Sequence, residues 1–179
     1  MRTFQDPLHL GISLNNKNPA ELMVLNLIDS APFQRLRRIR QLGPASLTFH
    51  GAESSRFTHS IGVFHIARRA FKSLLKIDIS LKKYEGLLYS ASLLHDIGHA
   101  PLSHTGEEIF GLKHEDWSAN LVKSHPDIQA ILENFQKGMS DDVSDLLGKN
   151  IAPHSVIKAL VSSQLDCDRL DYLIRDSYS

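Results

Sequence analysis

The 179-residue sequence has little cysteine, little tryptophan, no long apolar segment and no net charge. Its one cysteine, Cys167, cannot form an intramolecular disulfide, which favours a reducing, cytoplasmic location. No apolar run approaches the roughly 20 residues needed to span a bilayer, and the opening MRTFQDPLHLG lacks an apolar signal region. Basic and acidic residues number 20 each, so no bulk charge indicates a nucleic-acid or membrane partner. We therefore expect a cytoplasmic protein in which any polyanion site is local.

The apolar residues recur at helical spacing along most of the chain. One stripe comprises Val63, Phe64, Ala67, Ala70, Phe71, Leu74 and Leu75, and another comprises Tyr84, Leu87, Leu88, Ala91 and Leu94. Further helices are predicted over residues 20–29, 33–41, 115–123, 128–136, 143–147, 155–161 and 166–176. Only residues 47–49 and the first residues are weak extended candidates. With 42% hydrophobic and 22% charged residues, the chain predicts a single all-α domain, 1–179, with little or no β structure.

The stretch LLHDIGHAPLSH, residues 93–104, places three histidines and an aspartate in an apolar context. His95 follows Leu94 on the buried stripe, so its imidazole is expected to face the interior. Burying the neighbouring Asp96 carboxylate without a partner would be costly, and a metal ion held by both side chains removes that cost. His99 would share the same helical face if the helix continued that far. For the pair alone, a core histidine beside a capping aspartate is the more common explanation.

Two other segments supply groups of the same kind. His59 stands one turn before Val63 on the inward stripe of the preceding helix. The segment QLDCDRLDYLIRDS places Asp168, Tyr172 and Asp176 at four-residue spacing on one helical face. Two imidazoles and two carboxylates form a nitrogen and oxygen set suited to Mn, Fe, Ni or Zn. A solvated face held by Asp and Arg pairs is the alternative for the last segment.

In order and approximate separation, these motifs resemble the HD-superfamily metal-dependent phosphohydrolases, especially the deoxynucleoside triphosphate (dNTP) triphosphohydrolases. The matching segments are FQDPLHLG, LIDSAPFQRLRRIRQLG, RFTHS, HDIGHAPLSH, the HE pair at 114–115 and LDCDRLDYLIRDS. Leu10 departs from the family pattern DPIHG, which has glycine there. The resemblance implies an HD-domain helical bundle with a metal site in its core cleft. It also implies that the chain is the N-terminal part of a longer family architecture.

The resemblance assigns roles to individual positions. A divalent metal (Mn, Fe, Ni, Zn or Mg) would be held by His59, His95, Asp96 and Asp168. The catalytic positions, including the proton donor to the leaving 5′ oxygen, would be His99, His104, His114 and Glu115. The substrate-binding positions would be Gln41, Arg56, Asp166, Arg169, Tyr172 and Asp176. Among these, the two arginines would bind the triphosphate, although the family often has lysine at the position of Arg169.

The basic run RLRRIR, residues 35–40, has an ordinary and a functional interpretation. Phe33, Leu36, Ile39 and Leu42 can bury one side of a helix and leave its arginines as a solvated face. In allosterically regulated relatives, however, residues matching Arg2, Asp29, Gln34 and Arg37 bind an activating guanine nucleotide between subunits of a tetramer. The resemblance thus implies a homo-oligomer with GTP or dGTP as a candidate activator.

Three functions remain in competition. The leading one is hydrolysis of a dNTP to deoxynucleoside and tripolyphosphate. A second keeps the metal site but acts on another phosphoester, namely a nucleoside monophosphate, a cyclic dinucleotide or an alarmone; the HE pair and DRLDYLIRDS favour the first. A third is a non-catalytic nucleotide- or nucleic-acid-binding module that uses RLRRIR and binds in a salt-sensitive manner. The intact ligand set argues against the third.

Overall fold

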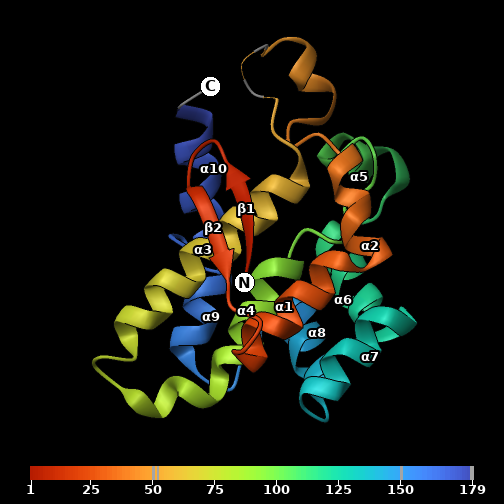
Figure 1. The fold of residues 1–179 in the computed structure, drawn as a ribbon. Helices are drawn as coiled ribbons and strands as arrows, with labels where there is room; N and C mark the ends of the chain where they lie inside the picture. Colours follow the sequence, from red (N-terminus) through yellow and green to blue (C-terminus); the bar gives the residue numbers. More distant parts are fainter. Residues whose placement is uncertain (50, 52, 150, 178–179) are drawn as a thin grey trace.

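A computed structural model describes residues 1–49, 51, 53–149 and 151–177. In these residues one β-hairpin, β1 (Arg2–Asp6) and β2 (Leu10–Leu14), precedes ten α-helices (Figure 1). The helices are α1 (Pro19–Asp29), α2 (Ala31–Gln34), α3 (Arg56–Leu74), α4 (Glu85–Leu94), α5 (His104–Phe110), α6 (His114–Ser124), α7 (Pro126–Phe135), α8 (Met139–Lys149), α9 (Ser155–Val161) and α10 (Cys167–Ser177). Three 3-10 helices connect them: η1 (Arg35–Arg38), η2 (Gly43–Leu47) and η3 (Ile79–Tyr84). The all-α prediction is confirmed.

Helices α3 and α4 form the centre of the core. They pack on each other, with α10 against α3 and with α1 and α8 against α4 (Figure 1). The ring of Tyr89 on α4 meets Phe64 and Phe71 of α3 edge-on, at centroid distances of 5.3 and 6.2 Å. All three side chains are fully buried, and each such burial stabilises the fold by about 1.5–3 kcal/mol. This packing fixes the two helices that lead to His59 and His95.

The N-terminal hairpin confirms the weak extended prediction for the first residues. β1 and β2 pair antiparallel, with Asp6 opposite Leu10 and Phe4 opposite the buried Ile12. The Asp6 carboxylate closes the turn by accepting hydrogen bonds from the amides of Leu8 and His9, both at 2.8 Å. Leu10 has a φ of 61°, the left-handed region in which glycine is unstrained. Leu10 therefore adopts a backbone conformation in which glycine, the residue of the family pattern, would be unstrained.

Two local predictions are wrong. The helix expected over 33–41 ends at Gln34 and continues only as η1, because the chain then turns to pair with residues 54–56. The amide of Arg56 donates to the Ile39 carbonyl at 2.9 Å, and the amide of Gln41 donates to the Ser54 carbonyl at 2.9 Å. The extended segment expected at 47–49 is replaced by the end of η2, a 3-10 helix with proline in its first turn.

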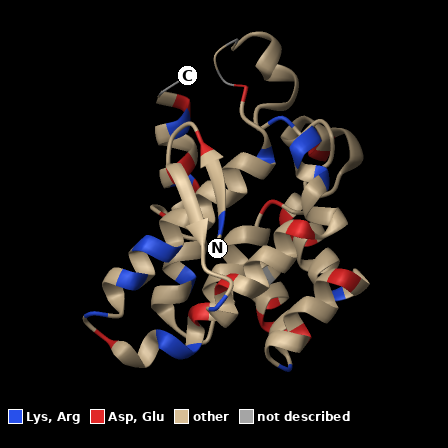
Figure 2. Cartoon of the chain, viewed as in Figure 1, with Lys and Arg blue, Asp and Glu red and all other residues tan. Residues whose placement is uncertain are grey.

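The charged residues are distributed as the equal numbers of acidic and basic residues would suggest. Acidic and basic residues are interspersed over most of the helices, with basic residues gathered around the end of α3 and along η3 (Figure 2). Within the described part of the chain, no helix has the length and apolar character required to cross a membrane.

Candidate functional site

Three structural elements bring the predicted metal ligands together. His59 lies on the first turn of α3, whose N-cap Ser55 accepts a hydrogen bond from a first-turn amide. His95 directly follows the last residue of α4. Asp168 lies on the first turn of α10, where Asp166 acts as the cap by accepting the amide of Arg169 at 2.9 Å. Capping thus fixes the start of both helices that carry ligands, and the core fixes their separation.

We call His59, His95, Asp96 and Asp168 the metal group. Nε2 of His59 lies 2.9 Å from Oδ1 of Asp168, 3.4 Å from Nε2 of His95 and 3.7 Å from Oδ2 of Asp96. Oδ1 of Asp96 lies 3.4 Å from Nε2 of His95. Ligand atoms of His59, His95 and Asp168 all lie within 4.8 Å of one another. Donor atoms of three predicted ligands, His59, His95 and Asp168, therefore converge, and the Asp96 carboxylate lies beside them.

The electrostatics of the metal group suit a divalent cation. Burial raises the pKa of Asp96, but the charges of His95 and Arg56 outweigh burial and hold the pKa well below its ordinary value. Burial lowers the pKa of His59, but hydrogen bonds to Asp168 and Asp171 outweigh it and raise the pKa to about 9. The carboxylates thus stay ionised and hold positive charge on the imidazole between them. A divalent cation would replace that charge, and the mixed nitrogen and oxygen donors fit such an ion.

Arg56 and Gln41 border the metal group. The Arg56 side chain is buried, and its guanidinium donates to the Asp96 carboxylate, to Oγ of Ser103 and to the carbonyl of Gln41. Within the described residues, Oε1 of Gln41 and Nε of Arg56 are buried without a hydrogen-bond partner. Triphosphate binding by Arg56 stays a prediction, and the structure shows that this arginine also neutralises Asp96.

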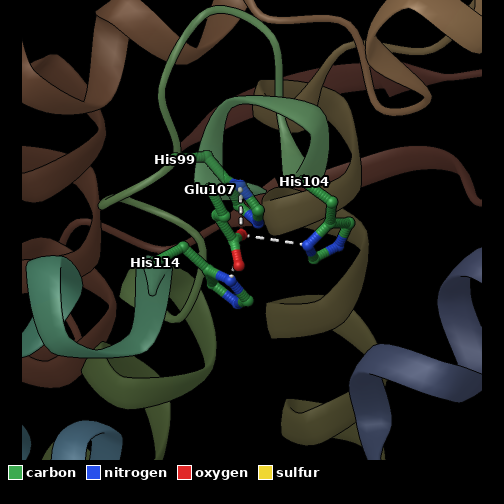
Figure 3. Close-up of side chains that lie close together, drawn as sticks. All are labelled: His99, His104, Glu107 and His114. Atoms are coloured by element: carbon green, nitrogen blue, oxygen red, sulfur yellow. Dashed lines mark hydrogen bonds and ion pairs between the residues drawn. The ribbon is translucent and has the colours of Figure 1, made fainter. Parts of the chain in front are cut away.

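A second group, the histidine cluster, consists of His99, His104, Glu107 and His114 (Figure 3). Oε1 of Glu107 accepts hydrogen bonds from Nδ1 of His114 at 2.8 Å and from Nδ1 of His104 at 2.9 Å. Nδ1 of His99 lies 3.5 Å from the same oxygen, and the ring of His99 stacks on that of His114 with centroids 3.9 Å apart. Three imidazoles therefore face one carboxylate oxygen.

Glu107 escaped the sequence prediction. Burial raises its pKa, but the hydrogen bond from His114 and the charges of the histidines outweigh burial and lower the pKa, so Glu107 is a carboxylate. The signal available in the sequence was its position three residues after His104, which places both side chains on one helical face. Burial lowers the pKa of His99 to about 4, so its imidazole is neutral at pH 7.

Side chains from η1 and α6 fix the backbone of residues 95–99, which connects the two groups. Helix α4 ends at Leu94 and does not continue to His99. The Arg35 guanidinium instead donates to the carbonyls of Ile97 and His99, at 2.5 and 2.7 Å. Oγ of Ser118, on α6, donates to the His95 carbonyl at 2.7 Å. The resulting turn brings Nε2 of His99 to 3.4 Å from Oδ1 of Asp96, which links the two groups.

The other predicted site residues lie on α6 and α10 or cap α10. Glu115 is half-exposed, with Oε2 lying 3.4 Å from Nδ1 of His114. On α10, Arg169 and Asp176 are exposed and Tyr172 is half-buried. Asp166 is buried as the helix cap described above.

The four candidate activator residues form two surface pairs. Nη1 of Arg2 donates to both carboxylate oxygens of Asp29, at 2.6 and 2.7 Å. Nε of Arg37 donates to Oε1 of Gln34 at 2.7 Å, and its guanidinium lies 3.6 Å above the ring of Phe57. The structure therefore pairs these residues with each other, and nucleotide binding stays a prediction.

The helical fold brings adjacent histidine and aspartate side chains together in its core, beside a cluster of further histidines, which is an arrangement suited to a metal-binding domain. The HD domain family model matches residues 56–176, and the chain belongs to this family. The matched region includes the whole metal group and the whole histidine cluster.

Individual relatives agree with this assignment. The chain is 41% identical over 181 residues to protein YwfO of Bacillus subtilis, covering 99% of the chain and 40% of YwfO. It is 28% identical over 214 residues to the deoxynucleoside triphosphate triphosphohydrolase SAMHD1 of mouse, covering 99% of the chain and 32% of SAMHD1. A solved phosphohydrolase of Bacteroides thetaiotaomicron superimposes with a TM-score of 0.79 at 31% identity, covering 99% of the chain and 42% of that structure. The chain therefore spans less than half the length of these relatives.

Proposed function

We propose that the protein hydrolyses deoxynucleoside triphosphates to a deoxynucleoside and tripolyphosphate. The observation that carries this proposal is the junction of the two groups at Asp96. Its Oδ1 lies 3.4 Å from Nε2 of His99 and 4.0 Å from Nε2 of His114. A phosphoryl group bound at the metal group would therefore lie within reach of imidazoles able to move a proton. Similarity to SAMHD1 supports the choice of substrate.

A divalent cation held by His59, His95, Asp96 and Asp168 would polarise the phosphoryl group and lower the pKa of a bound water. Glu107 accepts from Nδ1 of His114, which leaves Nε2 directed toward Asp96. His114 would donate a proton from Nε2 to the 5′ oxygen as the bond between that oxygen and phosphorus breaks. Water would bond to phosphorus and release a proton to solvent, from which His114 would regain its own. Neutral His99 would donate a hydrogen bond to a phosphate oxygen and contribute no proton.

Substrate recognition would use the groups at the edge of the site. The unpartnered Oε1 of Gln41 is an acceptor suited to a sugar hydroxyl, because a buried polar atom gains a hydrogen bond from such a ligand. Tyr172 and Asp176 would contact the same sugar, and Asp166 would line the pocket. Arg56 and Arg169 would bind the triphosphate through fixed positive charge.

Regulation by GTP or dGTP, in a homo-oligomer, is the part of the proposal that rests on Arg2, Asp29, Gln34 and Arg37. In the structure these side chains satisfy one another at the surface. A guanine edge would replace Arg2 as the partner of Asp29, and phosphate would engage the released arginines.

The test is a chromatographic product assay of the metal-loaded chain with each dNTP, with and without GTP. We expect deoxynucleoside and tripolyphosphate from wild type, loss of both products and of bound metal in Asp168→Ala, and no change in Asp116→Ala, which removes an exposed carboxylate of α6. Metal content of Asp168→Ala equal to wild type would reject the ligand assignment. Cleavage of another phosphoester without dNTP turnover would reject the substrate.

A further inference from the structure

A buried network of charged side chains lies behind the metal group. We call it the Asp171 network; its members are Asp6, His9, His59, Asp171 and Arg175. It joins the β1–β2 turn, α3 and α10, elements from opposite ends of the sequence (Figure 1). Each of these side chains is at most 8% exposed. Burying so many charged or titratable groups is costly unless they are mutually hydrogen-bonded. The loss of any one hydrogen bond in the network should therefore lower the stability of the fold.

Asp171 uses both carboxylate oxygens. Oδ2 accepts from Nδ1 of His59 at 2.8 Å and from Nε of Arg175 at 2.9 Å. Oδ1 accepts from Nε2 of His9 at 2.6 Å and from Nη2 of Arg175 at 3.0 Å. Nη2 of Arg175 also donates to Oδ2 of Asp6 at 3.2 Å. The carboxylate is thereby fixed in position and in rotation.

Gly62 makes this arrangement possible. It lies on α3, three residues after His59, where any side chain would project into the Asp171 network. A methyl group there would overlap Oδ1 of Asp171 and Nη2 of Arg175. The absence of a side chain at position 62 is therefore a requirement of the contact between α3 and α10.

We infer that Asp171 is a positioning residue of the metal centre and that it couples the N-terminal hairpin to metal binding. By accepting Nδ1–H of His59, Asp171 leaves Nε2 as the ligand atom and directs it toward Asp168 and Asp96. Carboxylates that hold ligating histidines in this way typically account for about 10- to 100-fold in metal affinity. The inference rests on the proposed metal centre.

His9 provides the coupling to the hairpin. It follows the turn that the Asp6 carboxylate closes, and it reaches the Asp171 oxygen that does not bond His59. Loosening the hairpin would therefore free Asp171 to rotate and weaken its hold on His59, without changing any metal ligand.

The experiment measures Mn²⁺ affinity by calorimetry and the visible absorption spectrum of the Co²⁺ form. We expect Asp171→Ala to weaken Mn²⁺ binding by about 10- to 100-fold and to change the Co²⁺ spectrum. Asp171→Asn retains an oxygen that can accept from His59 and should recover part of the affinity. His9→Gln should produce a smaller loss than Asp171→Ala. The control Glu133→Gln weakens the hydrogen bonds that this α7 carboxylate accepts from the amides of Gly138 and Ser140, away from the hairpin and the Asp171 network, and should lower stability while leaving Mn²⁺ affinity unchanged.

The outcomes separate this inference from the proposed function. Wild type without Mn²⁺ affinity would reject the metal centre itself. If wild type binds Mn²⁺ tightly, wild-type affinity in Asp171→Ala would overturn the positioning role alone. An equal loss of affinity in Glu133→Gln would overturn it as well. If Asp171→Ala does not fold, wild-type affinity and Co²⁺ spectrum in both Asp171→Asn and His9→Gln would overturn it.

Discussion

The metal group and the histidine cluster lie side by side but are built differently. In the metal group, His59 is fully buried and Asp96 nearly so, and both have further buried partners in Asp171 and Arg56. The open member of the metal group is Asp168, at 38% exposed. In the histidine cluster His99 is buried, whereas His114 is 15%, Glu107 21% and His104 66% exposed. The metal group is carried by α3, α10 and the end of α4, whereas the cluster is carried by the short α5, the first residue of α6 and the preceding turn.

This difference suits the two proposed tasks, which are metal binding and proton transfer. A metal site needs its donors fixed in place before the ion arrives, since each misplaced donor lowers the affinity. A group that transfers a proton must also reach a substrate that enters and leaves, and the partly exposed His114 and His104 keep such access. Rigidity is thus concentrated behind the metal group, and the cluster relies on one carboxylate, Glu107, for its order.

Gly62→Ala is expected to change stability more than the other substitutions, because it disrupts the buried network behind the metal group. The added methyl would break the buried contact between Asp171 and Arg175, and breaking such pairs costs about 3–5 kcal/mol. We expect a lower free energy of unfolding in urea. The control Gly11→Ala adds a methyl in ordinary contact, 3.5 Å from Thr3, and should change stability little. Equal stability of the two variants would contradict the requirement for glycine at position 62.

Glu107→Gln tests the exposed side of the comparison. An amide cannot hold two Nδ1–H groups as an ionised oxygen does, so we expect turnover to fall about 100-fold, equivalent to about 2.7 kcal/mol. Metal content and unfolding free energy should stay close to wild type. The matched control is Glu108→Gln, an exposed neighbour on α5, which should retain full turnover. A loss of bound metal in Glu107→Gln would show that the two groups are not separable.

The smallest expected effect concerns His65, half-buried on α3 beside the ring of His9 at 5.2 Å. Burial, assisted by the charges of Arg68 and His9, lowers the pKa of His65 to about 4, below the ordinary 6.5. The unfolded chain therefore binds the proton more readily between pH 6.5 and 4, so this contribution to stability is complete above pH 6.5 and falls as the solution is acidified. Urea unfolding at pH 7 and pH 5 should show a smaller pH dependence for His65→Gln than for wild type. Identical pH dependence would contradict the depressed pKa.

Periodicity and motif spacing predicted much of the fold and the convergence of the metal group. Apolar stripes fix which face of a long helix is buried, so the inward positions of His59 and His95 followed from Val63 and Leu94. The helix prediction for 33–41 was wrong because the apolar residues there are equally compatible with η1 followed by a turn. Backbone pairing with residues 54–56 favours η1 and the turn over a continuous helix. Competition between local propensity and distant pairing cannot be resolved from one segment.

The least predictable parts of the site depend on side chains from distant segments. Asp171 looked like one of several aspartates on α10, and its importance emerges only when His9 and His59 are seen to contact it. Glu107 likewise gains its role from His114, which belongs to another helix. Motif resemblance identified the histidines but not the carboxylate that orders them.

The Asp171 network also has a consequence for the order in which the chain acquires its structure. His9 and Asp171 are 162 residues apart, and Asp6 and Arg175 are 169 apart. Contacts between such distant residues close a very long loop, and their entropic cost is recovered only after the intervening helices have condensed. During synthesis, the hairpin and α3 emerge long before α10. The hydrogen bond between His59 and Asp171 can therefore form only at a late stage. The metal group can therefore be completed only after α10 has been synthesised and has packed against α3.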